Sequence, residues 1–100
     1  MTVLARADID QHLRTLEGWT LQDNAIRRQF TFAGFPEAVA FVQRLVPEAE
    51  QADHHPDITI NYRRVTLSYA THSEGGVTLK DIDGARMATR MADRMASSAS

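Results

Sequence analysis

The sequence predicts an α+β fold with two layers, in which a four-stranded antiparallel sheet carries three helices on one face. Helical spacing of apolar residues and strand-like alternation follow one another along the chain in the order α-β-β-α-β-β-α. Each predicted strand has one apolar and one polar side. Helices over a single face are therefore favoured, and the opposite face, rich in Thr, Ser, Gln and Asn, is expected to stay open.

Composition narrows the class of protein before any motif is considered. The 100 residues are 43% hydrophobic and 24% charged, which predicts a single compact domain over residues 1–100. A net charge of -2 argues against nucleic acid as the partner. The chain has no cysteine, so thiolate chemistry is excluded. No apolar run approaches the roughly 20 residues of a membrane span, and no signal peptide is evident, so we expect no membrane association and a cytoplasmic location.

The first half of the chain is predicted to form a helix and a hairpin. Asp8 and Gln11 have the residue types of a capping box, and apolar residues follow at helical spacing until Gly18, a natural stop. A strand-like alternation then runs over residues 19–32 across a turn. Its second strand places Arg28, as an exception, on the apolar side.

The second half begins with another helix and another hairpin. Pro36 suits the first turn of this helix, whose apolar stripe continues past Pro47. Because a proline inside a helix removes a hydrogen bond, we expect a kink or a new turn there. Alternation over residues 57–71 predicts the second hairpin, with Tyr62 and Tyr69 on its core side.

Three of the four histidines gather with an acid at the ends of predicted elements. His54 and His55 join the second helix to the third strand, and His72 ends the fourth strand. Asp81 lies in the first turn of the last helix, whose N-cap is Thr78. Polar side chains at element ends are the usual construction of a small-molecule site. One imidazole can accept a proton there while another, kept charged by a carboxylate, donates one.

Structural roles for the same residues stay open on the sequence alone. His54 and His55 before Pro56 also fit a helix C-terminus, where the dipole favours histidine. Asp81 would stabilise the N-terminus of its own helix, and Glu50 fits a solvated helix acid. Zinc is the rival chemical interpretation. Adjacent histidines diverge in direction, however, and no His-x-His or His-x3-His pair is present, so no metal site is predicted.

One spaced pattern in this region reads Glu50-x3-His54-His55-Pro56-x5-Tyr62-x9-His72-x8-Asp81. It resembles the signature of the pterin-4a-carbinolamine dehydratases. Comparable positions occur along the whole chain, namely Gly18-Trp19, Phe30-Thr31-Phe32, Thr71-His72 and Gly75-Gly76-Val77-Thr78. Several spaced matches over a chain of family length are a specific signal, whereas a bare His-His-Pro is a weak one.

The resemblance implies a hydro-lyase with the α-β-β-α-β-β-α fold. Its reaction would be the dehydration of 4a-hydroxytetrahydropterin to quinonoid dihydropterin, without metal or cofactor, in recycling of the tetrahydrobiopterin-type cofactor of aromatic amino-acid hydroxylases. Carried over by position, the catalytic residues are His54, His55 and His72. The residues that orient groups or bind substrate are Asp81, Thr71 and Glu50. Within this set we expect His54 to be the most critical group and Asp81 to orient or charge His72.

Some positions depart from the family pattern, and one alternative function accompanies it. Ile58 stands where many relatives have Trp, which predicts an aliphatic pocket wall, and Pro47 interrupts a helix that relatives run unbroken toward Glu50. Some members of the family are dimerisation cofactors of a homeodomain transcription factor, so a protein-binding module using the open sheet face is the alternative. We also expect a homodimer or homotetramer, formed through an edge strand or the last helix.

Overall fold

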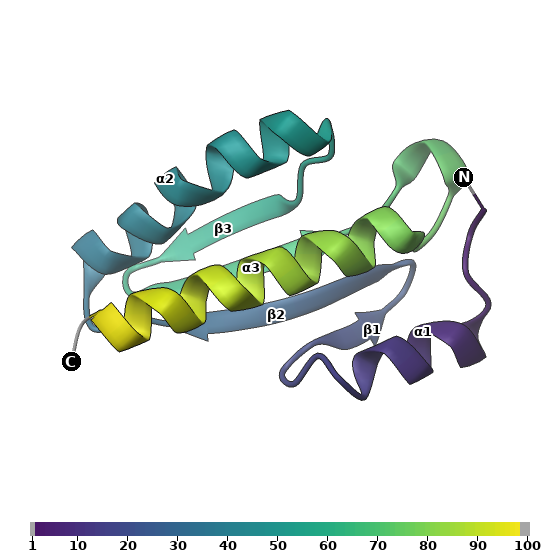
Figure 1. The fold of residues 1–100 in the computed structure, drawn as a ribbon, viewed down its shortest axis with the longest axis horizontal. Helices are drawn as coiled ribbons and strands as arrows, with labels where there is room; N and C mark the ends of the chain where they lie inside the picture. Colours follow the sequence, from purple (N-terminus) through teal and green to yellow (C-terminus); the bar gives the residue numbers. More distant parts are fainter. Residues whose placement is uncertain (1, 99–100) are drawn as a thin grey trace.

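The computed structural model describes residues 2–98, and its elements follow the predicted order. The helices and strands are α1 (Arg6–Leu13), β1 (Thr20–Gln22), β2 (Ala25–Thr31), α2 (Phe35–Ala52), β3 (Asp57–Asn61), β4 (Arg64–Tyr69) and α3 (Leu79–Ser98). A short 3-10 helix over His72–Glu74 occupies the connection from β4 to α3. The predicted α+β class is confirmed (Figure 1).

The sheet joins two hairpins through its central pair of strands. Its order is β1-β2-β4-β3, and every neighbouring pair is antiparallel. Asp57 at the start of β3 lies opposite Ser68 near the end of β4. The chain just before Asp57 therefore approaches the end of the sheet where the chain leaves β4. This register places the two histidine-bearing connections at the same end of the sheet.

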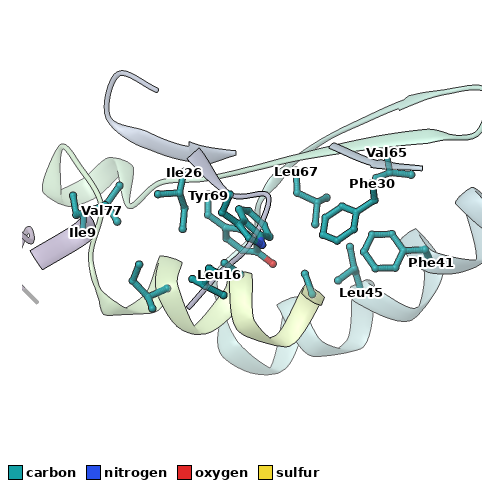
Figure 2. Close-up of a cluster of buried hydrophobic side chains, with 14 of the residues drawn as sticks. Ile9, Leu16, Ile26, Phe30, Phe41, Leu45, Val65, Leu67, Tyr69 and Val77 are labelled. Atoms are coloured by element: carbon teal, nitrogen blue, oxygen red, sulfur yellow. The ribbon is translucent and has the colours of Figure 1, made fainter. Parts of the chain in front are cut away.

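The hydrophobic core lies on one face of the sheet, beneath the helices. Strand side chains that point into it include Ile26, Phe30, Val65, Leu67 and Tyr69, all at most 3% exposed (Figure 2). Buried residues of all the helices complete the cluster, and α3 runs along the sheet in front of β4 and β2 (Figure 1). Polar side chains of β2, β3 and β4 line a hollow of about 480 Å³ on the other face. The predicted open polar face is therefore confirmed.

The edge strand β3 buries less than its alternation predicted. Ile58 and Ile60 point toward the helical side but remain 40% and 38% exposed, because β3 has β4 on only one flank and lies at the margin of the core. Tyr62 was predicted to be a core residue, and this is wrong. It occupies the turn between β3 and β4 with φ 57° and is 66% exposed. Tyr69, with the same predicted role, is buried.

Helix α1 begins and ends earlier than the capping pattern predicted. Its N-cap is Ala5, whose carbonyl accepts hydrogen bonds from the N–H groups of Asp8 and Ile9. Asp8 therefore lies inside the first turn and does not cap the helix. Turns continue after Leu13 as far as Gly18, which has φ 90°. This left-handed conformation favours glycine at position 18, and the Arg28 side chain packs 2.9 Å from where a Cβ would lie.

Helix α2 continues as one helix through Pro47, so the new turn that was one of the two expectations does not occur. Proline costs one backbone hydrogen bond, but this 18-residue helix buries a stripe that includes Phe41, Leu45 and Ala49 on either side of it. Packing of that stripe outweighs the lost bond. None of the helices within residues 2–98 is both long and apolar enough to cross a membrane.

Candidate active site

The end of α2 fixes the position of His54. Asp53 adopts the left-handed conformation with φ 49°, which aspartate tolerates better than most residues. The Asp53 N–H then bonds to the carbonyl of Glu50, and the His54 N–H bonds to that of Ala49 at 3.1 Å. This pair of bonds is the Schellman arrangement that closes a helix. The helix-terminus interpretation of these residues is therefore correct, and it also sets the backbone from which the His54 ring projects.

The contact between His54 and Asp81 is the more enclosed of the two histidine–carboxylate contacts in this region. The His54 Nε2 lies 2.5 Å from Asp81 Oδ1, and the two side chains are 12% and 0% exposed. Since an ionised carboxylate can only accept, the Nε2 carries the hydrogen of this bond. The other ring nitrogen, Nδ1, is then the one left for proton transfer in the neutral ring. The Tyr69 ring stacks beside the imidazole, with centroids 6.1 Å apart and planes 25° from parallel.

The other carboxylate oxygen of Asp81 accepts two hydrogen bonds from the segment that leads into α3. Its Oδ2 accepts the Thr71 hydroxyl at 2.8 Å and the Thr78 backbone N–H at 2.9 Å. The second bond, together with the contact from the Lys80 N–H to the Thr78 hydroxyl, makes a capping box at the helix N-terminus. The predicted capping roles of Thr78 and Asp81 are confirmed. The same carboxylate therefore serves the helix and His54 at once.

Asp81 contacts a different histidine from the one expected. We expected it to orient His72, whereas its described contacts are with His54, Thr71 and Thr78. The physical reason is that the two side chains lie on opposite sides of the sheet. Asp81, in the first turn of α3, is buried on the helical side, whereas His72 is exposed and lines the hollow on the open face. Thr71, next to His72 in the chain, is buried and faces Asp81 instead.

His55 has its own acidic partner on the outer side of α2. Its Nε2 lies 2.5 Å from Glu50 Oε2, and the two side chains are 54% and 69% exposed. Glu50 is thus solvated, as expected of a helix acid, but it also pairs with a histidine of the predicted site. Because α2 continues through Pro47, Glu50 stands on the last turn of this helix. An exposed pair of this kind stabilises the fold by about 1 kcal/mol at most.

The three histidines converge on one end of the sheet without sharing one cavity. His54 lines a groove of about 310 Å³ between α2 and α3, and His55 lines one of about 210 Å³ beside Ile58. His72 lines the open-face hollow with Asp57, Ser68 and Ala70 among others. A ligand that meets all three must therefore lie across the end of the sheet. Within residues 2–98 no group of three or more His, Cys, Asp or Glu side chains is arranged to hold a metal ion.

Tyr69 gives a measurable signature of this enclosed region. Burial, reinforced by the charge of Asp81, raises the pKa of its phenol from 10.0 to about 12. The unfolded chain loses this proton near pH 10 and the folded protein keeps it, so the free energy of unfolding falls as the pH rises from about 10 to about 12. We expect Tyr69→Phe to remove this alkaline loss, which amounts to about 2–3 kcal/mol at most.

Urea unfolding followed through that pH range measures the effect of Tyr69→Phe. Tyr62→Phe is the matched control, because Tyr62 is 66% exposed. It should retain the alkaline loss of the unaltered chain. The same alkaline slope in Tyr69→Phe as in the unaltered protein would contradict the role of the buried phenol.

Two parts of the His54 surroundings were missed in the sequence. Thr78 was identified only as a cap, although the pattern Thr78-x-x-Asp81 is a capping box and already indicates the bond from its N–H to Asp81. The stacking of Tyr69 on His54 has no local signal, because it depends on how α2 and β4 meet. Gly84 of α3 permits that packing, since a Cβ there would lie 2.5 Å from Tyr69 Cε1.

Comparison with known proteins gives a consistent set of relatives. The family described as Pterin 4 alpha carbinolamine dehydratase matches residues 2–91. A provisionally assigned pterin-4-alpha-carbinolamine dehydratase of Roseiflexus sp. (strain RS-1) is 51% identical, over 82% of this chain and 88% of that protein. One from Mycobacterium avium (strain 104) is 46% identical, over 86% of this chain and 92% of its own length.

Solved structures support the same fold. The crystal structure described as a transcriptional coactivator/pterin dehydratase from Brucella melitensis has a TM-score of 0.88 and 40% identity, covering 91% of this chain and 99% of that one. A pterin dehydratase-like protein identified as a RuBisCO assembly factor in the alpha-carboxysome has a TM-score of 0.61, covering 74% of this chain and 86% of that one. At 17% identity this second likeness shows the fold alone.

Proposed function

Because the chain belongs to the pterin-4a-carbinolamine dehydratase family, a family of hydro-lyases, we propose that it converts 4a-hydroxytetrahydropterin to quinonoid dihydropterin and water by histidine general acid and base catalysis. The observation that carries the mechanism is the contact between His54 and the buried Asp81 at the end of the sheet. A carboxylate in this position holds an imidazole in one tautomer and stabilises the cation that forms when the ring takes up a proton.

His54 is proposed as the base. With its Nε2–H bonded to Asp81, its Nδ1 is the atom that accepts a proton from the pterin ring nitrogen. The carbon–oxygen bond to the 4a-hydroxyl breaks as a carbon–nitrogen double bond forms, so no free cation accumulates. Transfer of a proton to a positioned group of this kind contributes roughly a hundredfold to ten-thousandfold to the rate.

His72 and His55 are proposed as the acid and the binding partner. The departing hydroxyl must receive a proton to leave as water, and a protonated imidazole can supply it. His55 is paired through its Nε2 with Glu50, which holds the ring in place for binding. His72 instead approaches from the open face, where it lines the polar hollow. The number of protons on the protein is unchanged over one turnover, because the proton taken by His54 returns to the acid through solvent.

The decisive test is the dehydration rate of 4a-hydroxytetrahydropterin, measured by stopped-flow with the unaltered protein and His72→Ala. We expect the unaltered protein to dehydrate the substrate and His72→Ala to turn over roughly a hundredfold more slowly, the effect of losing one proton donor. Since His72 is exposed and outside the core, the variant should fold normally. An unaltered protein that leaves the spontaneous rate unchanged would refute the proposed function.

A protein-binding role is the second proposed function. It is favoured by the uncovered polar face of the sheet and by the description of the Brucella melitensis relative as a transcriptional coactivator as well as a pterin dehydratase. An inactive protein that nevertheless binds a protein partner through this face would support it. We also propose that the chain acts in the cytoplasm as a homodimer or homotetramer, since β3 is paired on one edge only within the described residues.

A further inference from the structure

Two threonine hydroxyls lie behind the carboxylate that contacts His54. The Thr71 hydroxyl is 2.8 Å from Asp81 Oδ2 and 2.8 Å from the Thr78 hydroxyl. All three side chains are buried, with Thr71 6% exposed and Thr78 and Asp81 0% exposed. No buried polar atom of the described side chains lacks a partner. The chain of contacts from Thr78 to His54 is therefore complete and shielded from water.

The direction of each hydrogen bond follows from the chemistry of its ends. Asp81 can only accept, so the single hydrogen of the Thr71 hydroxyl is donated to it. The contact between the two threonines must then be a donation from Thr78 to Thr71. The Thr78 oxygen in turn accepts the Lys80 N–H at 3.3 Å. Every donor thus points toward Asp81, and such an aligned chain strengthens its last bond.

Backbone contacts hold both threonines in place. Thr71 closes the turn before α3 by exchanging hydrogen bonds with Gly76, at 3.0 Å for its own N–H and 3.4 Å for its carbonyl. Thr78 is the N-cap of α3, and its N–H is bonded to Asp81. The neighbouring Val77 carbonyl accepts the Leu4 N–H at 2.8 Å, which ties this connection to the N-terminal segment. The hydroxyls therefore project from anchored backbone.

We propose that Thr71 and Thr78 are positioning residues, in which Thr78 acts through Thr71 to fix the Asp81 carboxylate and thereby the orientation and tautomer of His54. Thr71 would then support Asp81 from a buried position and would not contact substrate. Its hydroxyl already donates to Asp81 and accepts from Thr78. The effect on turnover rests on the proposed function, whereas the effect on the His54 ring does not.

A double-mutant cycle with Thr71→Val and Thr78→Val tests the proposal, with two readouts. Valine keeps the shape of threonine and removes the hydroxyl. NMR of the His54 ring reports the tautomer and the low-field signal of the Nε2–H bonded to Asp81. Turnover is measured as kcat and KM separately. Thr31→Val, on an exposed position of β2, controls for the substitution itself, and Thr71→Ser restores the hydroxyl.

Thr71→Val should lower kcat about tenfold with little change in KM, since it removes a hydrogen bond to a charged group. It should also shift the Nε2–H signal of His54, and Thr71→Ser should restore both. Thr78→Val should lower kcat by a smaller factor, about threefold. In the Thr71→Val background Thr78→Val should have no further effect on kcat or on the His54 signal, although it still removes a helix cap and lowers Tm in both backgrounds.

An unchanged His54 signal in Thr71→Val would overturn the positioning role. Independent, additive effects of Thr78→Val in the two backgrounds would show that Thr78 does not act through Thr71, and would overturn that part. If a variant is unfolded by circular dichroism, the serine variants at the same positions decide, because they should match the unaltered protein in both readouts. If the unaltered protein proves inactive, the NMR cycle still decides this inference while the proposed function fails.

Discussion

Replacing Asp81 with asparagine should lower turnover roughly a hundredfold to ten-thousandfold, by reversing the tautomer of His54. Asparagine has a single side-chain oxygen, so it can accept hydrogen bonds either from His54 or from Thr71 and Thr78, but not from both sides. The Oδ2 side receives two donors, the Thr71 hydroxyl and the Thr78 N–H, so the amide oxygen should turn to that side. The amide NH2 then faces Nε2 of His54, which must accept, and the ring hydrogen moves to Nδ1. The proposed base is thereby lost.

The contrast with Asp93→Asn makes this prediction specific. Asp93 is exposed on a later turn of α3 and does not line the groove of His54, so its replacement removes the same charge from the same helix away from the site. We expect Asp93→Asn to retain nearly full turnover. Nitrogen shifts of the His54 ring should reveal the reversed tautomer in Asp81→Asn alone. Full activity in Asp81→Asn, with an unchanged His54 spectrum, would contradict the assigned role of the buried carboxylate.

Replacing His54 with alanine should abolish most turnover while leaving the fold intact. The loss of the proposed base costs roughly a hundredfold to ten-thousandfold in rate. The backbone of residue 54 keeps its bond to the Ala49 carbonyl, and Asp81 keeps the Thr71 hydroxyl and the Thr78 N–H. A buried carboxylate that loses one of its partners should still lower the free energy of unfolding by about 1–3 kcal/mol.

Imidazole added to His54→Ala provides a direct check of the missing group. The removed ring faces a groove of about 310 Å³, so a free imidazole can reach Asp81 and recover part of the rate. His12→Ala is the matched control, because His12 lies on α1 and contacts Arg86 rather than any residue of the site. Dehydration at the unaltered rate in His54→Ala would remove His54 from the mechanism.

Local patterns in the chain were sufficient for most of the fold. Element order and the polar face of the sheet follow from periodicity, which depends on neighbours in sequence. The errors occurred where distant packing prevailed. Pro47 stays within α2 because the helix buries a long apolar stripe. Tyr62 lies outside the core because its backbone forms the turn between β3 and β4. At α1 the first turn closes on Ala5 before Asp8 can cap it.

The sequence by itself determined which residues form the candidate site, because His54, His55, His72 and Asp81 stand at element ends in a spacing shared with a family. Only the tertiary structure decided how they are paired. Asp81 meets His54 because α3 packs on the helical side of the sheet, where Gly84 lets Tyr69 fit closely. His72 is turned to the opposite face. The face of the sheet toward which a connecting residue points depends on packing between segments far apart in the chain. The spacing of residues along the chain does not indicate it.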